Sequence, residues 1–197
     1  MIGAAVAGSL VGRRRHGRLG LADLFAVAFV AGTQGVTEWT LHRYVLHQPP
    51  RTVAGRTIDM AAGHRGHHEE PDSVPGALLG TPYAANAIVL ICGYVVGLSR
   101  LVPAGRQRHQ AMWSTLALGY VGLGLYEWIH LLVHTSVRPR SRRFAELRTN
   151  HRLHHFRNEQ NWFGVTTTLG DRLLGTLPES ASAVVLRGAA RHPQRDV

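Results

Sequence analysis

Long apolar blocks alternate with polar ones along this chain. Residues 76–99 contain no charged side chain, and residues 111–126 are again uncharged before the apolar run continues to His134. Each run is long enough to cross the hydrocarbon core of a membrane as an α-helix. Because only a short basic loop, residues 100–110, separates them, the pattern predicts an antiparallel helical hairpin. Gly93 and Gly97 in the first run suit close helix packing.

Two weaker apolar segments precede this hairpin. Residues 19–41 are mostly apolar but include Asp23 and Glu38, so we interpret them as an imperfect first membrane helix. Pro49 and Pro50 prevent that helix from continuing. Residues 1–12 are too short to span a bilayer, and arginines follow them instead of preceding them, which is the wrong order for a signal peptide. They are a candidate for a partial fourth span.

The pattern predicts an all-α integral membrane protein, a bundle of three to four membrane helices with a histidine-rich helical cap. We expect an N-terminal apolar and basic segment (1–18), a membrane domain (19–178) and a polar C-terminal tail (179–197). Residues 48–75 are polar and rich in turn formers. Gly63 and Gly66 weaken any helix there, so we expect bound metal to contribute to its order.

The net charge of the chain indicates what kind of partner it meets. The chain has 197 residues, and its 22 basic residues are all arginine against 12 acids, for a formal net charge of +10. Such a balance is typical of proteins that meet nucleic acid or an anionic membrane surface. The arginines flank apolar runs and do not alternate with exposed aromatics, which favours the membrane and argues against nucleic acid. The single cysteine, Cys92, cannot form an intrachain disulfide, so no oxidising compartment is implied.

Histidine supplies the candidate chemistry. The pattern His-x-x-His-His occurs twice, at residues 64–68 and 151–155. With this histidine content, chance supplies only about 0.06 such matches in a chain of this length. Positions i, i+3 and i+4 fall on one helical face, so we expect each trio to present three imidazoles to one point. Neutral imidazole is a common ligand for iron, copper, nickel and zinc.

Two histidine pairs complete the set, and they lie at the ends of the predicted spans. Ten ligands exceed the four to six that one metal ion takes, so we predict two metal ions with about five nitrogens each, or fewer with open positions. His42 and His47 lie roughly 140° apart on a regular helix, so their convergence requires a helix end or a local distortion. The candidate ligands are His42, His47, His64, His67, His68, His130, His134, His151, His154 and His155.

The predicted topology gives these histidines a location. With three spans at 19–41, 76–99 and 111–134, all four clusters fall on one membrane face. That face carries 15 arginines against 7 on the other, so the positive-inside rule predicts the cytoplasmic side. The arginines at 13–18 lie on the opposite face, against this rule. Two other interpretations of the clusters remain, a hydrogen-bonded network of neutral imidazoles and a structural zinc site, although no cysteine accompanies the histidines.

Four motifs and a closing segment carry a resemblance to a known family. They read Glu38-Trp-x-x-His-Arg-Tyr-x-Leu-His, His64-x-x-His-His-Glu-x-Pro, Tyr126-Glu-x-x-His-x-x-x-His, Asn150-His-x-x-His-His-Phe and Phe163-Gly-Val-Thr-Thr, with Asp171 and Gly175-Thr176 following. Over residues 38–178 they resemble the membrane fatty acid hydroxylase/sterol desaturase superfamily. The spacing of the third pair and the closing segment are most similar to fatty acid 2-hydroxylases.

This resemblance implies a centre of two iron ions that uses O2 to hydroxylate a lipid, with a fatty acyl chain as the expected substrate. Zinc is a possible occupant in isolated protein. The alternatives are a sterol- or carotenoid-directed hydroxylase or desaturase, and a non-catalytic membrane metal-binding protein. The chain departs from eukaryotic relatives because we find no fused cytochrome b5 domain and one span fewer. We therefore expect a separate electron donor, similar to ferredoxin or a cytochrome.

Polar residues beside the motifs are candidates for orienting the imidazoles. Cleavage of an unactivated C–H bond requires a redox metal, and a metal ligand is commonly held by a hydrogen bond through its second nitrogen. The alternative for each residue is an ordinary helix-terminal or surface position. The candidates are Glu38, Glu69, Glu127, Asn150 and Asp171.

Overall fold

The structure is a computed structural model that describes residues 1–178, so the predicted polar tail lies outside the described residues. The described chain is helical apart from one short hairpin. The α-helices are α1 (Ile2–Arg14), α2 (Leu21–Leu41), α3 (Ala62–Glu69), α4 (Thr81–Ser99), α5 (Arg106–Val133), α6 (Arg142–Phe156) and α7 (Leu169–Leu174). A π-helix (His42–Leu46), a 3-10 turn (Pro75–Ala77) and strands β1 (Arg51–Val53) and β2 (Arg56–Ile58) complete the fold.

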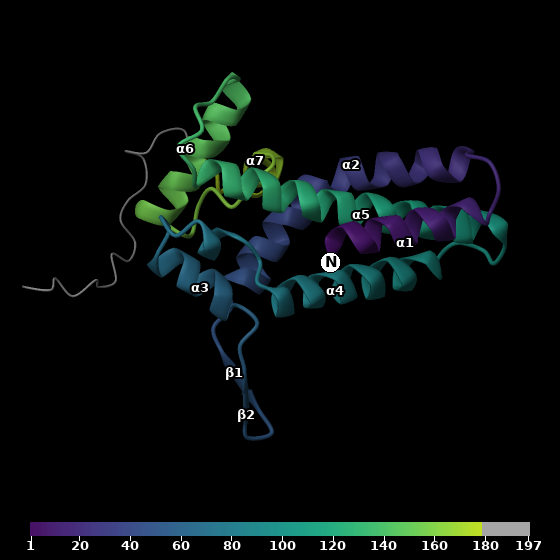
Figure 1. Ribbon diagram of the computed structural model, residues 1–197, viewed down its shortest axis with the longest axis horizontal. Helices are drawn as coiled ribbons and strands as arrows, with labels where there is room; N and C mark the ends of the chain where they lie inside the picture. The colour runs from purple at the N-terminus through teal and green to yellow at the C-terminus, as the bar shows by residue number, and fades with distance from the viewer. Residues whose placement is uncertain (179–197) are drawn as a thin grey trace, which may run out of the picture.

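Helices α1, α2, α4 and α5 run side by side along the long axis of the molecule (Figure 1). The longest, α5, contacts α1, α2 and α4, and a core cluster of Val95, Leu116 and Tyr120 joins α4 to α5. The predicted antiparallel hairpin is present as α4 and α5, although α5 begins at Arg106, before its apolar run. The N-terminal segment forms α1, which packs along α5 as a shorter fourth member of the bundle.

Two segments, Pro75–Ser99 and Arg106–Val133, are long and apolar enough to cross a membrane. Only 11% and 28% of their apolar windows are buried inside the protein, so side chains such as Val89 and Leu125 are exposed. The core helix of a water-soluble protein would bury such a face, whereas lipid solvates it. The two helices therefore indicate membrane association. Helix α2 does not pass the same test, and the third span stays a prediction.

A buried ion pair closes the end of the bundle opposite the histidines. Arg13 of α1 donates to both carboxylate oxygens of Asp23 of α2, each at 2.5 Å, and also to the Gly17 carbonyl. The hydroxyl of Ser114 on α5 donates to the same carboxylate. One of the arginines that opposes the positive-inside rule is thus neutralised by a partner within the bundle.

The close helix packing predicted at Gly93 and Gly97 is wrong within this chain. A Cβ added at either glycine would meet nothing within 4 Å, because both residues lie on the exposed side of α4. Close approach occurs instead between α2 and α7, where a Cβ on Gly170 would lie 2.4 Å from the carbonyl oxygen of Gly35. The bundle is therefore tightly joined to the segment that follows α6.

A cap of α3, α6 and the π-helix gathers at the end of the bundle where α2 and α5 finish (Figure 1). Despite Gly63 and Gly66, residues 62–69 form a helix. The β1–β2 hairpin projects sideways from this end, with Thr52 paired to Thr57 in antiparallel register. Segments far apart in the sequence thus meet over one end of the apolar bundle.

Candidate metal centre

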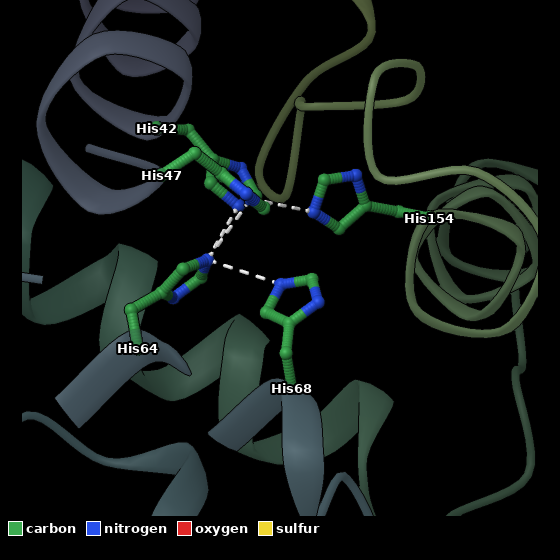
Figure 2. A group of neighbouring side chains, drawn as sticks. All are labelled: His42, His47, His64, His68 and His154. Atoms are coloured by element: carbon green, nitrogen blue, oxygen red, sulfur yellow. Dashed lines mark hydrogen bonds between the residues drawn. The ribbon is translucent and has the colours of Figure 1, made fainter. Parts of the chain in front are cut away.

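The ten predicted histidines gather in this cap in two groups of five. In each group the five ligand atoms lie within 4.8 Å of one another. Figure 2 shows the first group, with side chains that converge from three separate segments. The first group consists of His42, His47, His64, His68 and His154. The second group consists of His67, His130, His134, His151 and His155.

The prediction that each trio points to one metal is wrong, because both trios are divided between the groups. His151 and His155 join the second group with their ring centroids 4.6 Å apart, whereas His154 belongs to the first and its ring lies 6.0 Å from that of His151. In the earlier trio, His64 and His68 belong to the first group and only His67 belongs to the second. On a helix, positions i and i+4 differ by about 40° but i+3 and i+4 by about 100°, so adjacent histidines face different centres.

A local distortion brings His42 and His47 together, as their spacing predicts. Residues 42–46 form a π-helix, and the His47 amide donates to the His42 carbonyl at 3.1 Å. The wider π-turn places residues i and i+5 on nearly the same side. The two rings lie 5.1 Å apart, and both belong to the first group.

Backbone carbonyls fix the orientation of three imidazoles. The Nδ1–H groups of His42, His130 and His154 donate to the carbonyls of Phe163, Ala77 and Asn161 at 2.5, 2.7 and 2.7 Å. A neutral imidazole has one N–H, so each of these rings presents the lone pair of Nε2 to the centre of its group. In this tautomer Nε2 can bind a metal while Nδ1 keeps its hydrogen bond to the carbonyl.

The Nε2 atoms are packed too closely for hydrogen bonds alone to satisfy them. The Nε2 atom of His64 lies 3.1–3.2 Å from the Nε2 atoms of three neighbours, and that of His151 lies 2.8–3.1 Å from three others. One ring proton can serve only one of these contacts, so lone pairs are left facing one another in a buried site. A cation at the centre of each group would stabilise this arrangement, and the donor set therefore fits two metal ions.

Burial keeps the histidines in the neutral form that a metal requires. The pKa of His42 is lowered to about 3, first by burial and then by the neighbouring His47. Burial is also the main cause that lowers the pKa of His67 to about 4 and of His68 to about 2. His151 and His154 are completely inaccessible to solvent. At neutral pH these rings carry no charge of their own, and their lone pairs are available.

Two buried carboxylates hold the loop that orients His42. Asp171 accepts hydrogen bonds from the Phe163 and Gly164 amides at 2.8 and 2.7 Å. Glu38 accepts from the amides of Val165 and Thr166 and from the Thr166 hydroxyl. A Cβ on Gly164 would lie 2.1 Å from the Thr167 carbonyl oxygen, so the loop also requires glycine there. Both carboxylates therefore act on the imidazole through the backbone and not by touching it.

The second group has a matching arrangement. Glu127, one turn before His130 on α5, accepts from the amide of Leu79, and the nearby Ala77 carbonyl receives the His130 Nδ1–H. Glu38 on α2 likewise lies one turn before His42, the first residue of the π-helix. Each of the two helices thus carries a carboxylate that accepts hydrogen bonds from a neighbouring segment. The same segment provides the backbone carbonyl that orients the histidine one turn later.

Asn150 and Glu69, the two remaining candidates for orienting the imidazoles, differ in burial. Asn150 is buried beside His151, and its Nδ2 atom has no hydrogen-bond partner within residues 1–178. Glu69 is exposed on α3.

Sequence reasoning missed Glu159 and the three carbonyl acceptors. A carboxylate oxygen of Glu159 lies 3.5 Å from His47 Nδ1 and 3.9 Å from His68 Nδ1, and the hydrogen bond with His47 lowers the pKa of this carboxyl. Glu159 follows the second trio by only four residues, and this closeness to the motif was the available signal. Main-chain carbonyls give no signal in a sequence because every residue has one.

Comparisons with known proteins identify the family of this chain. The fatty acid hydroxylase family model matches residues 26–176. The chain is 31% identical over 152 residues to the dihydroceramide fatty acyl 2-hydroxylase FAH2 of Arabidopsis thaliana, covering 77% of this chain and 60% of that protein. It is 26% identical over 160 residues to the fatty acid 2-hydroxylase of Rattus norvegicus, covering 80% of this chain and 40% of that protein.

The chain thus spans 60% and 40% of the length of these two curated relatives, less than two thirds of each. No solved structure matches it. The family model nevertheless covers most of the chain and includes all ten clustered histidines. The chain therefore belongs to the fatty acid hydroxylase family.

Proposed function

We propose that this protein is a membrane enzyme that uses two iron ions and O2 to hydroxylate a lipid, with a fatty acyl chain as the substrate. The observation that carries the proposal is the pair of five-imidazole groups at one end of a bundle with exposed apolar helices. Relatives named as fatty acyl and fatty acid 2-hydroxylases support the choice of substrate.

The donor set suits this chemistry. Five nitrogens per ion leave one position open in a six-coordinate site, and all-nitrogen ligation is compatible with iron. When bound, iron would supply the redox chemistry of the balanced reaction, in which RH, O2, two electrons and two protons give ROH and water. The chain itself holds the imidazoles neutral, orients three of them through carbonyls and excludes water from His151 and His154.

The position of the site favours a substrate that is already in the membrane. His130 and His134 follow directly from the apolar segment of α5, and the exposed faces of α4 and α5 suit contact with acyl chains. A lipid beside the bundle can thus reach the cap without its chain entering water. Tyr126 lies beside the second group, since its ring stacks on His130 with centroids 5.6 Å apart.

We place the site on the cytoplasmic face, because that assignment puts the larger number of arginines inside. The two electrons come from a separate donor protein in this proposal. The membrane domain is taken as residues 19–178, which contain every residue of both groups.

The test is a lipid analysis of cells that express the full chain with iron supplied. We expect a hydroxylated acyl product with the wild type and none with His154→Ala. His109→Ala is the matched control, because His109 is exposed and lies outside both groups. Metal analysis of the same membranes should give two iron ions per wild-type chain. Unchanged lipids with iron bound would refute the enzyme, and a product that has lost two hydrogens without gaining oxygen would identify a desaturase.

A further inference from the structure

Helix α6 is basic, whereas α3 and the turn after it are acidic. Residues 138–157 contain seven arginines and one glutamate, and this glutamate, Glu146, is paired with Arg172 at 3.1 Å. By contrast, α3 and the turn after it expose Glu69, Glu70 and Asp72. The only arginine within α3, Arg65, is paired with Asp59. An acidic protein would therefore be attracted to α6 and repelled by α3.

The arginines of α6 are free to meet a partner. Arg142 and Arg152 are exposed, and neither forms an ion pair with a carboxylate of residues 1–178. Arg152 lies over the ring of Phe156, 5.7 Å from its centroid, and Phe156 is itself 60% exposed. Arginine and an exposed aromatic ring are the residue types enriched at protein interfaces. We name this surface, made by Arg142, Thr149, Arg152 and Phe156, the α6 face.

The same helix reaches both metal-binding groups. His154 belongs to the first group, whereas His151 and His155 belong to the second. A helix with its side chains is about 10 Å across, so the part of the α6 face around Arg152 and Phe156 is separated from both groups by roughly one helix thickness. Figure 1 shows α6 at the cap end of the bundle, whereas the C-terminal ends of α1 and α4 lie at the other end.

We propose that the α6 face is the docking surface for the electron donor, a small acidic electron-transfer protein. This inference rests on the proposed function, which consumes two electrons for each lipid hydroxylated. The donor is oxidised by one electron at each encounter, and two encounters supply the pair that reduces O2 to water and the inserted oxygen. Such encounters are brief and are governed by charge more than by buried area.

The test measures turnover of the full chain in nanodiscs of neutral lipid. Electrons are supplied by a [2Fe–2S] ferredoxin with its reductase, by a soluble cytochrome b5, or by dithionite with methyl viologen, which needs no docking. The test variant is Arg142→Glu/Arg152→Glu. The control is Arg51→Glu/Arg56→Glu on the exposed β1–β2 hairpin, which changes the net charge equally but away from α6.

We expect the α6 variant to lower kcat/KM for the protein donor about 10-fold at low salt, mainly through KM, and the loss to shrink as salt rises. The rate with the chemical reductant should not change, and the hairpin variant should behave as wild type. Equal losses in both variants, an unchanged KM, or a wild type that turns over only with the chemical reductant would overturn the docking site. A loss confined to nanodiscs with anionic lipid would assign the surface to headgroups instead. Absence of product with every reductant would refute the proposed function itself.

Discussion

Asp171→Asn tests whether the loop at 162–166 positions the first group of histidines. Asp171 is 1% exposed and accepts from the amides of Phe163 and Gly164 through different oxygens. Its Oδ1 atom also accepts from the Thr176 hydroxyl at 2.6 Å. In asparagine one oxygen becomes an NH2 group. Whichever way the amide turns, one loop N–H faces another donor in a buried site.

The free-energy cost of Asp171→Asn follows from the hydrogen bonds that are lost. A buried N–H left without an acceptor costs about 1–3 kcal/mol, and hydrogen bonds to a charged group contribute about 1.5–3 kcal/mol each. These effects overlap, so we expect a local cost of about 2–4 kcal/mol. The loop should shift, and the Phe163 carbonyl should no longer hold the Nδ1–H of His42. Loss of such an orienting partner typically lowers metal affinity about 10- to 100-fold.

The assay is a metal titration of chelator-treated protein, in which the two sites fill separately. We expect one site to weaken in Asp171→Asn and the other to keep its wild-type affinity, because His130 depends on the Ala77 carbonyl instead. Glu127→Gln is the matched variant for the second group. Equal weakening of both sites by Asp171→Asn, or no weakening of either, would refute the reasoning.

Three further predictions follow from the site and from the far end of the bundle. His154→Ala/His42→Ala should lose one metal ion per chain, whereas His154→Ala/His151→Ala should lose both, and metal analysis with equal losses in the two variants would contradict the division of the trio. Metal-free protein should become less stable as the pH falls from about 6.5 towards the lowered folded-state pKa values. The reason is that His42, with a folded pKa of about 3, stays unprotonated in the folded state while the unfolded chain binds a proton there. Chemical denaturation at several pH values checks this, and a constant free energy of unfolding would be evidence against it. Arg13→Met should lower the free energy of unfolding by about 3–5 kcal/mol, because it leaves Asp23 buried without its partner. Arg13→Met/Asp23→Asn should restore most of this stability in thermal unfolding. Losses that simply add in the double variant would disprove the prediction.

Much of the fold was predictable because its determinants are local. The uncharged runs, the short basic loop and the pair of prolines after His47 fix the α4–α5 hairpin and the end of α2. The Gly93 prediction failed because small residues show where helices are able to approach, not which face of a helix meets a neighbour. The charge of Arg13 was similarly misleading in isolation, since its partner Asp23 lies on another helix.

The number and spacing of the histidines were enough to predict two groups at one end of the bundle. Only the packing of the segments shows that each trio is shared between the groups, as with His154 and His151. Spacing defines angles about a helix's own axis, whereas the group that a ring joins depends on the histidines that neighbouring segments bring opposite it. The carbonyls that select the tautomers, and Glu159 beside His47, were decided in the same way, because backbone groups and distant acids become partners only when the chain has folded.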